Sequence, residues 1–109
     1  MKVTSPAGEP LACNLNALTT SERARHDALG AKLREAAIRR EELRNGYAFA
    51  IDPARVPLSE IAEWVAFEAR CCPFLDFGIE LRAKVGQLTL RLAGEHREVK
   101  AFLTQELRL

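Results

Sequence analysis

Residues 75–92, LDFGIELRAKVGQLTLRL, are the stretch that decides the fold. Apolar side chains alternate with polar residues or glycine on both sides of a turn that contains Gly86. This period of two is typical of strands with one buried face, so the stretch predicts a β-hairpin. Its apolar face comprises Leu75, Phe77, Ile79 and Leu81 on one arm and Leu88, Leu90 and Leu92 on the other.

The residues before the hairpin begin with a helical pattern. Thr19 and Glu22 have the spacing of a capping box, which marks the start of a helix. Apolar side chains then recur at helical spacing as far as residue 43, and Asn45-Gly46 is a stop signal. The spacing therefore predicts one long helix over residues 19–43.

Three further elements follow from the same reasoning. Residues 47–51 alternate as a short strand, and Pro57 suits the first turn of a helix that Pro73 stops, over about 57–72. A third helix is predicted in the C-terminal residues after position 94. The expected core face of the 57–72 helix consists of Leu58, Ile61, Ala62, Val65, Ala69 and Cys72.

These elements predict an α+β fold with a small antiparallel sheet of three or four strands. About three helices would cover one face of the sheet and form a two-layer sandwich. Residues 1–12 are expected to be a flexible or irregular N-terminal arm, and residues 13–109 a single domain. The other sheet face carries small residues and is either solvent-exposed, which we favour, or a homodimer surface.

Charge and hydropathy exclude several classes of function. Sixteen basic and fifteen acidic residues give a net charge of +1, which disfavours a nucleic-acid binder. No apolar run approaches the roughly 20 residues that span a membrane, and the first residues lack the apolar core of a signal peptide. We therefore expect a cytoplasmic protein. No nucleotide, phosphate-loop or catalytic-triad motif is present, which argues against a cofactor-dependent enzyme.

The three cysteines, Cys13, Cys71 and Cys72, are the sharpest chemical feature. A reducing cytoplasm disfavours disulfides, and a bond between adjacent residues is strained, although a bond from either one to Cys13 remains open. The side chains of Cys71 and Cys72 leave the helix about 100° apart. Cys72 continues the expected core face, whereas Cys71 continues a ridge through Trp64 and Phe67.

Convergence of the three thiols would create a metal site. Thiolates prefer soft ions, so Cys13, Cys71 and Cys72 would bind Zn(II), Cu(I), Hg(II) or a metalloid, and His26 is a candidate nitrogen ligand. One alternative is that the cysteines fill the core of a structural or interaction module and that His26 is a structural histidine. Another makes Cys71 a redox nucleophile, although the negative helix end raises its pKa.

Acidic residues near the thiols have a simpler interpretation. Glu60, Glu63 and Glu68 spread around the helix, which favours a solvated face over acid–base chemistry. Glu68 alone is close enough in sequence to contact Cys71, at a spacing of i to i+3. There it would either orient a ligand or pair with solvent.

The segment EARCCPFLDF, residues 68–77, resembles a group of small uncharacterised bacterial proteins that carry the motif Glu-Xaa-Xaa-Cys-Cys-Pro-Phe-Leu-Xaa-Phe. The similarity extends over nearly the whole chain from Cys13, with Cys13-Asn14-Leu15 upstream and residues 90–94 downstream. The resemblance implies an association with metal resistance, which agrees with the metal hypothesis.

Overall fold

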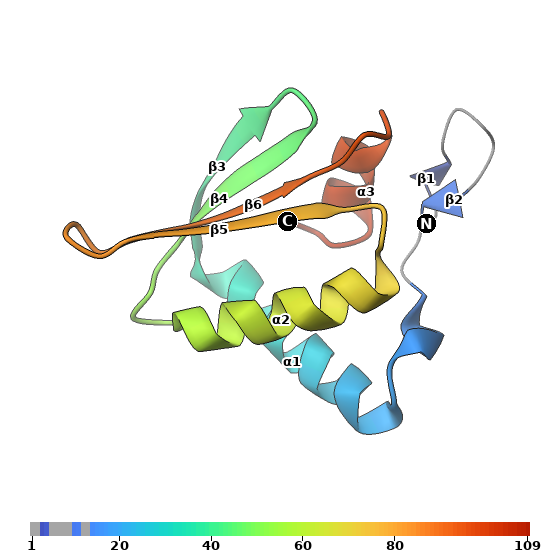
Figure 1. The fold of residues 1–109 in the computed structure, drawn as a ribbon, viewed down its shortest axis with the longest axis horizontal. Coiled ribbons are helices and arrows are strands. Elements are labelled where there is room, and N and C mark those ends of the chain that lie inside the picture. Colours follow the sequence, from blue (N-terminus) through green and yellow to red (C-terminus); the bar gives the residue numbers. More distant parts are fainter. Residues whose placement is uncertain (1–2, 5–9, 12–13) are drawn as a thin grey trace.

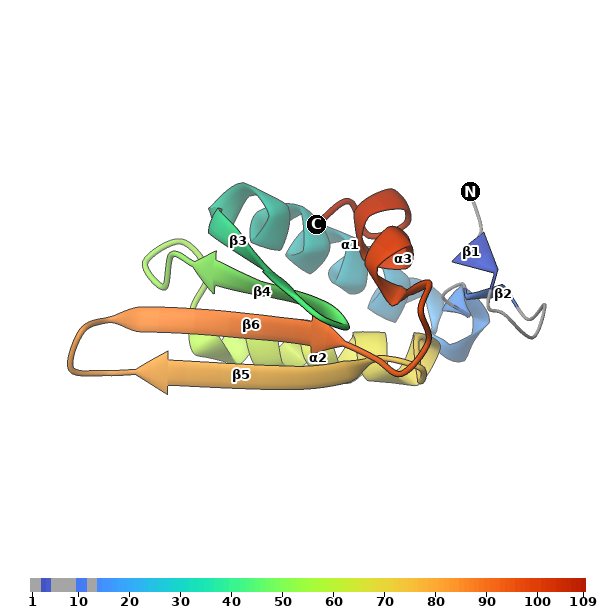
Figure 2. The ribbon, with the colours of Figure 1, turned by 90° about the horizontal axis from the view of Figure 1, so that it is seen from above.

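The structure, a computed structural model, describes residues 3–4, 10–11 and 14–109. Its main sheet has four antiparallel strands in the order β3-β4-β6-β5 (Figures 1 and 2). Their bounds are β3 Ala37–Leu43, β4 Gly46–Ile51, β5 Asp76–Arg82 and β6 Gln87–Ala93. The predicted α+β class is therefore confirmed. Cys13 and much of the predicted arm over residues 1–12 lie outside the described residues, apart from a short pair, β1 Val3–Thr4 and β2 Pro10–Leu11.

Three α-helices in the described part of the chain pack with the sheet around one core (Figure 1). They are α1 Thr20–Ala36, α2 Leu58–Cys71 and α3 Val99–Gln105, and a short 3₁₀ turn, η1 Leu15–Ala17, precedes them. The alternating leucines of β6 are fully buried in this core, as the hairpin pattern predicts, but the predicted buried face is wrong for Ile79 and Leu81 of β5, which are 37% and 46% exposed. No helix in the described residues is long and apolar enough to cross a membrane.

The predicted capping box at the start of α1 is confirmed. Thr19 Oγ1 accepts a hydrogen bond from the Glu22 backbone N–H at 3.2 Å, and Glu22 Oε1 accepts one from the Thr19 N–H at 2.9 Å. Both bonds satisfy N–H groups that have no partner within the helix. The reciprocal pair fixes the first turn of α1.

The predicted end of that helix is wrong. The helix ends at Ala36, and residues 37–43 form the edge strand β3, which pairs with β4. The Asn45-Gly46 signal belongs to the β3–β4 hairpin, not to a helix stop. Most of β3 is exposed, including Ile38 at 70%. Pairing with β4 has overridden the helical propensity of this charged segment.

The predicted core face of α2 is only partly confirmed, because Ile61 and Cys72 are fully buried and the other predicted members are not. Ala62 and Ala69 are exposed, and the Leu58 side chain is 41% exposed. The helix is rotated by about one residue relative to the expectation, so that a different stripe faces the core. The buried side chains of α2 are Ile61, Trp64, Glu68 and Cys71.

Candidate metal centre

A buried carboxylate lies where α1 and α2 pack together. Glu68 of α2 is fully buried, and it is the single buried charged residue in the described part of the chain. Burial of an ionised carboxylate is costly unless it has close polar or charged partners. The expectation of a solvated face is therefore wrong for Glu68.

The other two glutamates behave as expected for a surface. Glu63 pairs with Arg25 at 2.9 Å, and Glu60 pairs with Lys32 at 2.5 Å. Each pair joins α2 to α1 across a partly exposed seam. These bridges lower the pKa of both carboxyl groups, chiefly through the hydrogen bonds from Arg25 and Lys32.

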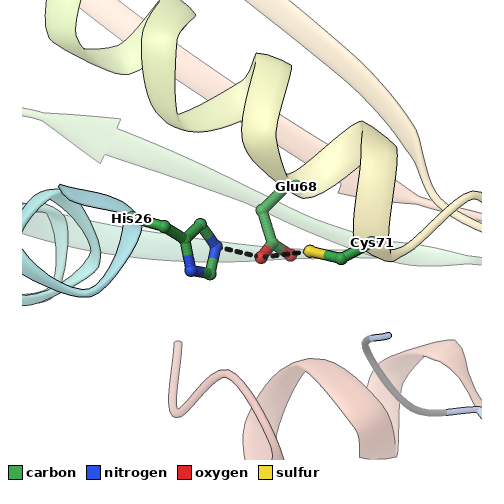
Figure 3. Close-up of side chains that lie close together, drawn as sticks. All are labelled: His26, Glu68 and Cys71. Carbon is green, nitrogen blue, oxygen red and sulfur yellow. Dashed lines mark hydrogen bonds and ion pairs between the residues drawn. The ribbon is translucent and has the colours of Figure 1, made fainter. Parts of the chain in front are cut away.

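His26 of α1 is the partner of the buried carboxylate. Its Nε2 lies 2.5 Å from Glu68 Oε1, and its side chain is 13% exposed (Figure 3). The imidazole lies parallel to the Trp64 ring, with centroids 6.3 Å apart, and meets Phe67 edge-on at 6.4 Å. These aromatic rings hold the imidazole with Nε2 directed at the carboxylate.

Cys71 contacts the same carboxylate from the other side (Figure 3). It is fully buried and forms no disulfide, and its Sγ lies 3.8 Å from Glu68 Oε1 and 3.4 Å from the Phe67 carbonyl oxygen. Burial raises the pKa of the Cys71 thiol to about 12, and the negative charge of Glu68 adds to the effect. Cys71 is therefore a protonated hydrogen-bond donor at neutral pH.

Three different ligand types thus converge between the two helices. A nitrogen of His26, an oxygen of Glu68 and the sulfur of Cys71 all lie within 4.8 Å of one another. Ligand atoms held about 2.0–2.3 Å from one tetrahedral ion lie about 3.3–3.8 Å apart. The nitrogen and oxygen would have to separate by about 1 Å to admit an ion at such distances.

Of the three predicted thiol ligands, the structure describes Cys71 and Cys72 but not Cys13. Cys72 is fully buried and disulfide-bonded, so in this state it offers no thiolate. Cys13 lies outside the described residues. A ligand set of Cys13, Cys71 and Cys72 stays a prediction, whereas His26 and Cys71 lie together with Glu68 as their common neighbour.

Glu68 is the site residue that sequence reasoning placed on the surface. Its buried position follows the stripe of residues 61, 64, 68 and 71, which repeats at helical spacing with one carboxylate among apolar side chains. That spacing was a usable signal. It competed with a second stripe one residue away, rich in alanine, which reads equally well as a core face.

No family model, curated protein or solved structure matches the chain.

Proposed function

We propose that the protein binds a thiophilic metal ion of the Zn(II) type through His26 Nε2, the Glu68 carboxylate and Cys71 Sγ. The convergence of these three ligand atoms within 4.8 Å, between two helices, is the observation that carries the proposal. Three protein ligands leave a fourth position for water, a substrate or a further side chain.

The mixed donor set favours Zn(II) over softer ions. Imidazole, carboxylate and thiolate all bind Zn(II), whereas Cu(I) and Hg(II) favour sites dominated by sulfur. One free thiol in the cluster satisfies that preference poorly. Reduction of the Cys72 disulfide would release a further thiol, so we expect Cu(I), Hg(II) and As(III) to gain affinity under reducing conditions.

Metal binding would overcome the high pKa of Cys71, because coordination of a thiol removes its proton. Binding therefore releases a proton, and the apparent affinity should rise with pH over the neutral range. The same raised pKa disfavours a redox or nucleophilic role, since a thiol with a pKa of about 12 is almost entirely protonated at neutral pH.

Titration with Co(II) as a spectroscopic probe, followed by Zn(II) competition and native mass spectrometry, tests the proposal. We expect one ion per chain and a sulfur-to-cobalt charge-transfer band that Cys71→Ser abolishes. His26→Gln and Glu68→Gln should each weaken binding at least about tenfold, because each removes a ligand of comparable importance. His96→Gln is the matched control, since this second histidine lies outside the cluster.

Two results would overturn the metal assignment. One is the absence of a stoichiometric adduct with Zn(II), Co(II), Cu(I), Hg(II) and As(III) in both oxidised and reduced protein. The other is an adduct whose affinity is unchanged in Cys71→Ser. Either outcome would favour the structural alternative, in which His26 and Glu68 form a buried pair and the cysteines only pack.

The cytoplasmic location and a homodimer through the open sheet face stay predictions from the sequence.

A further inference from the structure

A second polar feature lies at the end of the sheet where the β3–β4 turn meets the link from β6 to α3. These segments surround an open hollow of about 410 Å³. Arg44 and Asn45 of the turn line one side, and residues 94–97 of the link with Lys100 of α3 line the other. The hollow shares no residue with the metal centre.

Backbone contacts hold the two sides of the hollow together. The Gly94 N–H donates to the Asn45 carbonyl oxygen at 3.1 Å, which ties the link to the turn. Gly94 is buried, and a Cβ at this position would lie 2.8 Å from the Phe74 carbonyl oxygen. The close approach at Gly94 keeps the wall of the hollow at a fixed place between the two segments.

The lining is cationic, and part of its charge has no counter-ion. Lys100 Nζ contacts Glu42 Oε2 at 2.6 Å, so this charge is already paired. Arg44 and Arg97 form no ion pair with any residue in the described part of the chain. Glu95 is the one carboxylate of the lining. Arg44 and Arg97 therefore bring two positive charges to the lining that no ion pair neutralises.

We propose that this hollow binds a small molecule that carries a phosphate group. A guanidinium presents a planar fork of donors that matches the oxygens of a phosphate, and two forks suit a dianion. His96, which is partly buried in the same lining, supplies a further ring nitrogen. A volume of about 410 Å³ is in the range of small-ligand sites, so the rest of a phosphate ester has room beside its phosphate.

Titrations at constant ionic strength, followed by amide chemical shifts, test this site with inorganic phosphate, glycerol phosphate and acetate. We expect saturable shifts in residues 44–45 and 94–100 with both phosphates, and tighter binding of glycerol phosphate. Acetate should bind more weakly, because it carries a single charge. Arg44→Gln and Arg97→Gln should each weaken phosphate binding about tenfold, the effect of losing a charge-assisted hydrogen bond.

Arg82→Gln is the matched control for net charge. Arg82 is an exposed arginine at the end of β5, paired with Gln87 beside the opposite turn of the sheet. Phosphate affinity in this variant should equal that of the wild type. The proposal is overturned if no saturable shift occurs, or if Arg82→Gln weakens binding as much as Arg44→Gln and Arg97→Gln, which would indicate non-specific attraction of anions. Neither result depends on metal binding.

Discussion

At the scale of single residues, Glu68 explains why Cys71 differs from an ordinary core cysteine. Its carboxylate lies between the His26 imidazole and the Cys71 thiol, so both donors face one acceptor (Figure 3). Removing one partner of such a buried group costs more free energy of unfolding than the hydrogen bond itself contributes. The reason is that the remaining polar atoms stay buried without a hydrogen-bond partner. Chemistry and stability are therefore coupled at these three positions.

The thiol of Cys71 should make stability fall at alkaline pH. Its pKa is raised from 9.0 to about 12 in the folded protein, so the unfolded chain loses this proton first. Stability from this group is fully present below pH 9 and is lost as the pH rises towards 12. Between these values the slope approaches at most about 1.4 kcal/mol per pH unit.

Urea unfolding of wild type and Cys71→Ala between pH 8 and about pH 10.5 measures this effect. The difference between the two proteins should be constant below pH 9, and above it the wild type should lose stability faster. Other groups that titrate in this range are common to both proteins and cancel. A pH-independent difference would show that the Cys71 pKa is not raised by folding.

At the scale of elements, the sequence predicted features that rest on local signals well and features that depend on tertiary contacts poorly. The capping box at Thr19 and the alternation in β6 are local signals, and both are confirmed. The end of α1 is not local, because residues 37–43 become a strand only through pairing with β4. Likewise, the orientation of α2 depends on where α1 packs, which decides that Glu68 faces inward.

The candidate metal centre could likewise be predicted only in part from the sequence. Cys71 and His26 could be singled out by residue type, since sulfur and imidazole are common metal ligands. Their meeting depends on how α1 and α2 pack, and no sequence spacing within one helix reports it. The phosphate-type hollow depends on the Gly94–Asn45 contact between segments about half the chain apart, so His96 alone gave no useful signal.

The contact of Arg70 with Glu22 predicts how the helix pair responds to acid. Arg70 near the end of α2 bonds Glu22 at 2.8 Å and the Ala17 carbonyl oxygen at 2.7 Å. The Arg70 hydrogen bond, followed by that from the Thr19 N–H, lowers the pKa of Glu22 from 4.5 to about 2. Its contribution is therefore present above pH 4.5 and is lost as the pH falls towards 2.

Glu22→Gln tests this contact, because glutamine keeps the acceptor of the capping box and removes the charge. Thermal unfolding should show a less stable variant at pH 6–7 and convergence with the wild type near pH 2. Glu41→Gln on the exposed strand β3 is the control, and it should follow the wild type throughout. A Glu22→Gln deficit of equal size at pH 2 and pH 7 would contradict the assignment.

At the scale of the whole molecule, the cysteine chemistry connects the end of α2 to the rest of the chain. Cys72 is disulfide-bonded and Cys71 is free. The backbone N–H of Asn14 donates to the Cys71 carbonyl oxygen at 2.8 Å, so Asn14, directly before η1, lies against the end of α2. The sequence holds one further cysteine, Cys13, and we predict that peptide mapping under non-reducing conditions will link it to Cys72.

Reduction of this bond should lower the stability of the whole molecule. A disulfide that closes a loop of several dozen residues restricts the unfolded chain and typically contributes about 2–4 kcal/mol. Urea unfolding with and without a phosphine reductant should show a loss of this size in wild type and in Cys71→Ser, and none in Cys72→Ser. Equal free energies of unfolding for oxidised and reduced wild type would show that the disulfide does not stabilise the fold. In a reducing compartment the same equilibrium would free Cys72, so the redox state would set both the stability of the fold and the number of free thiols in the protein.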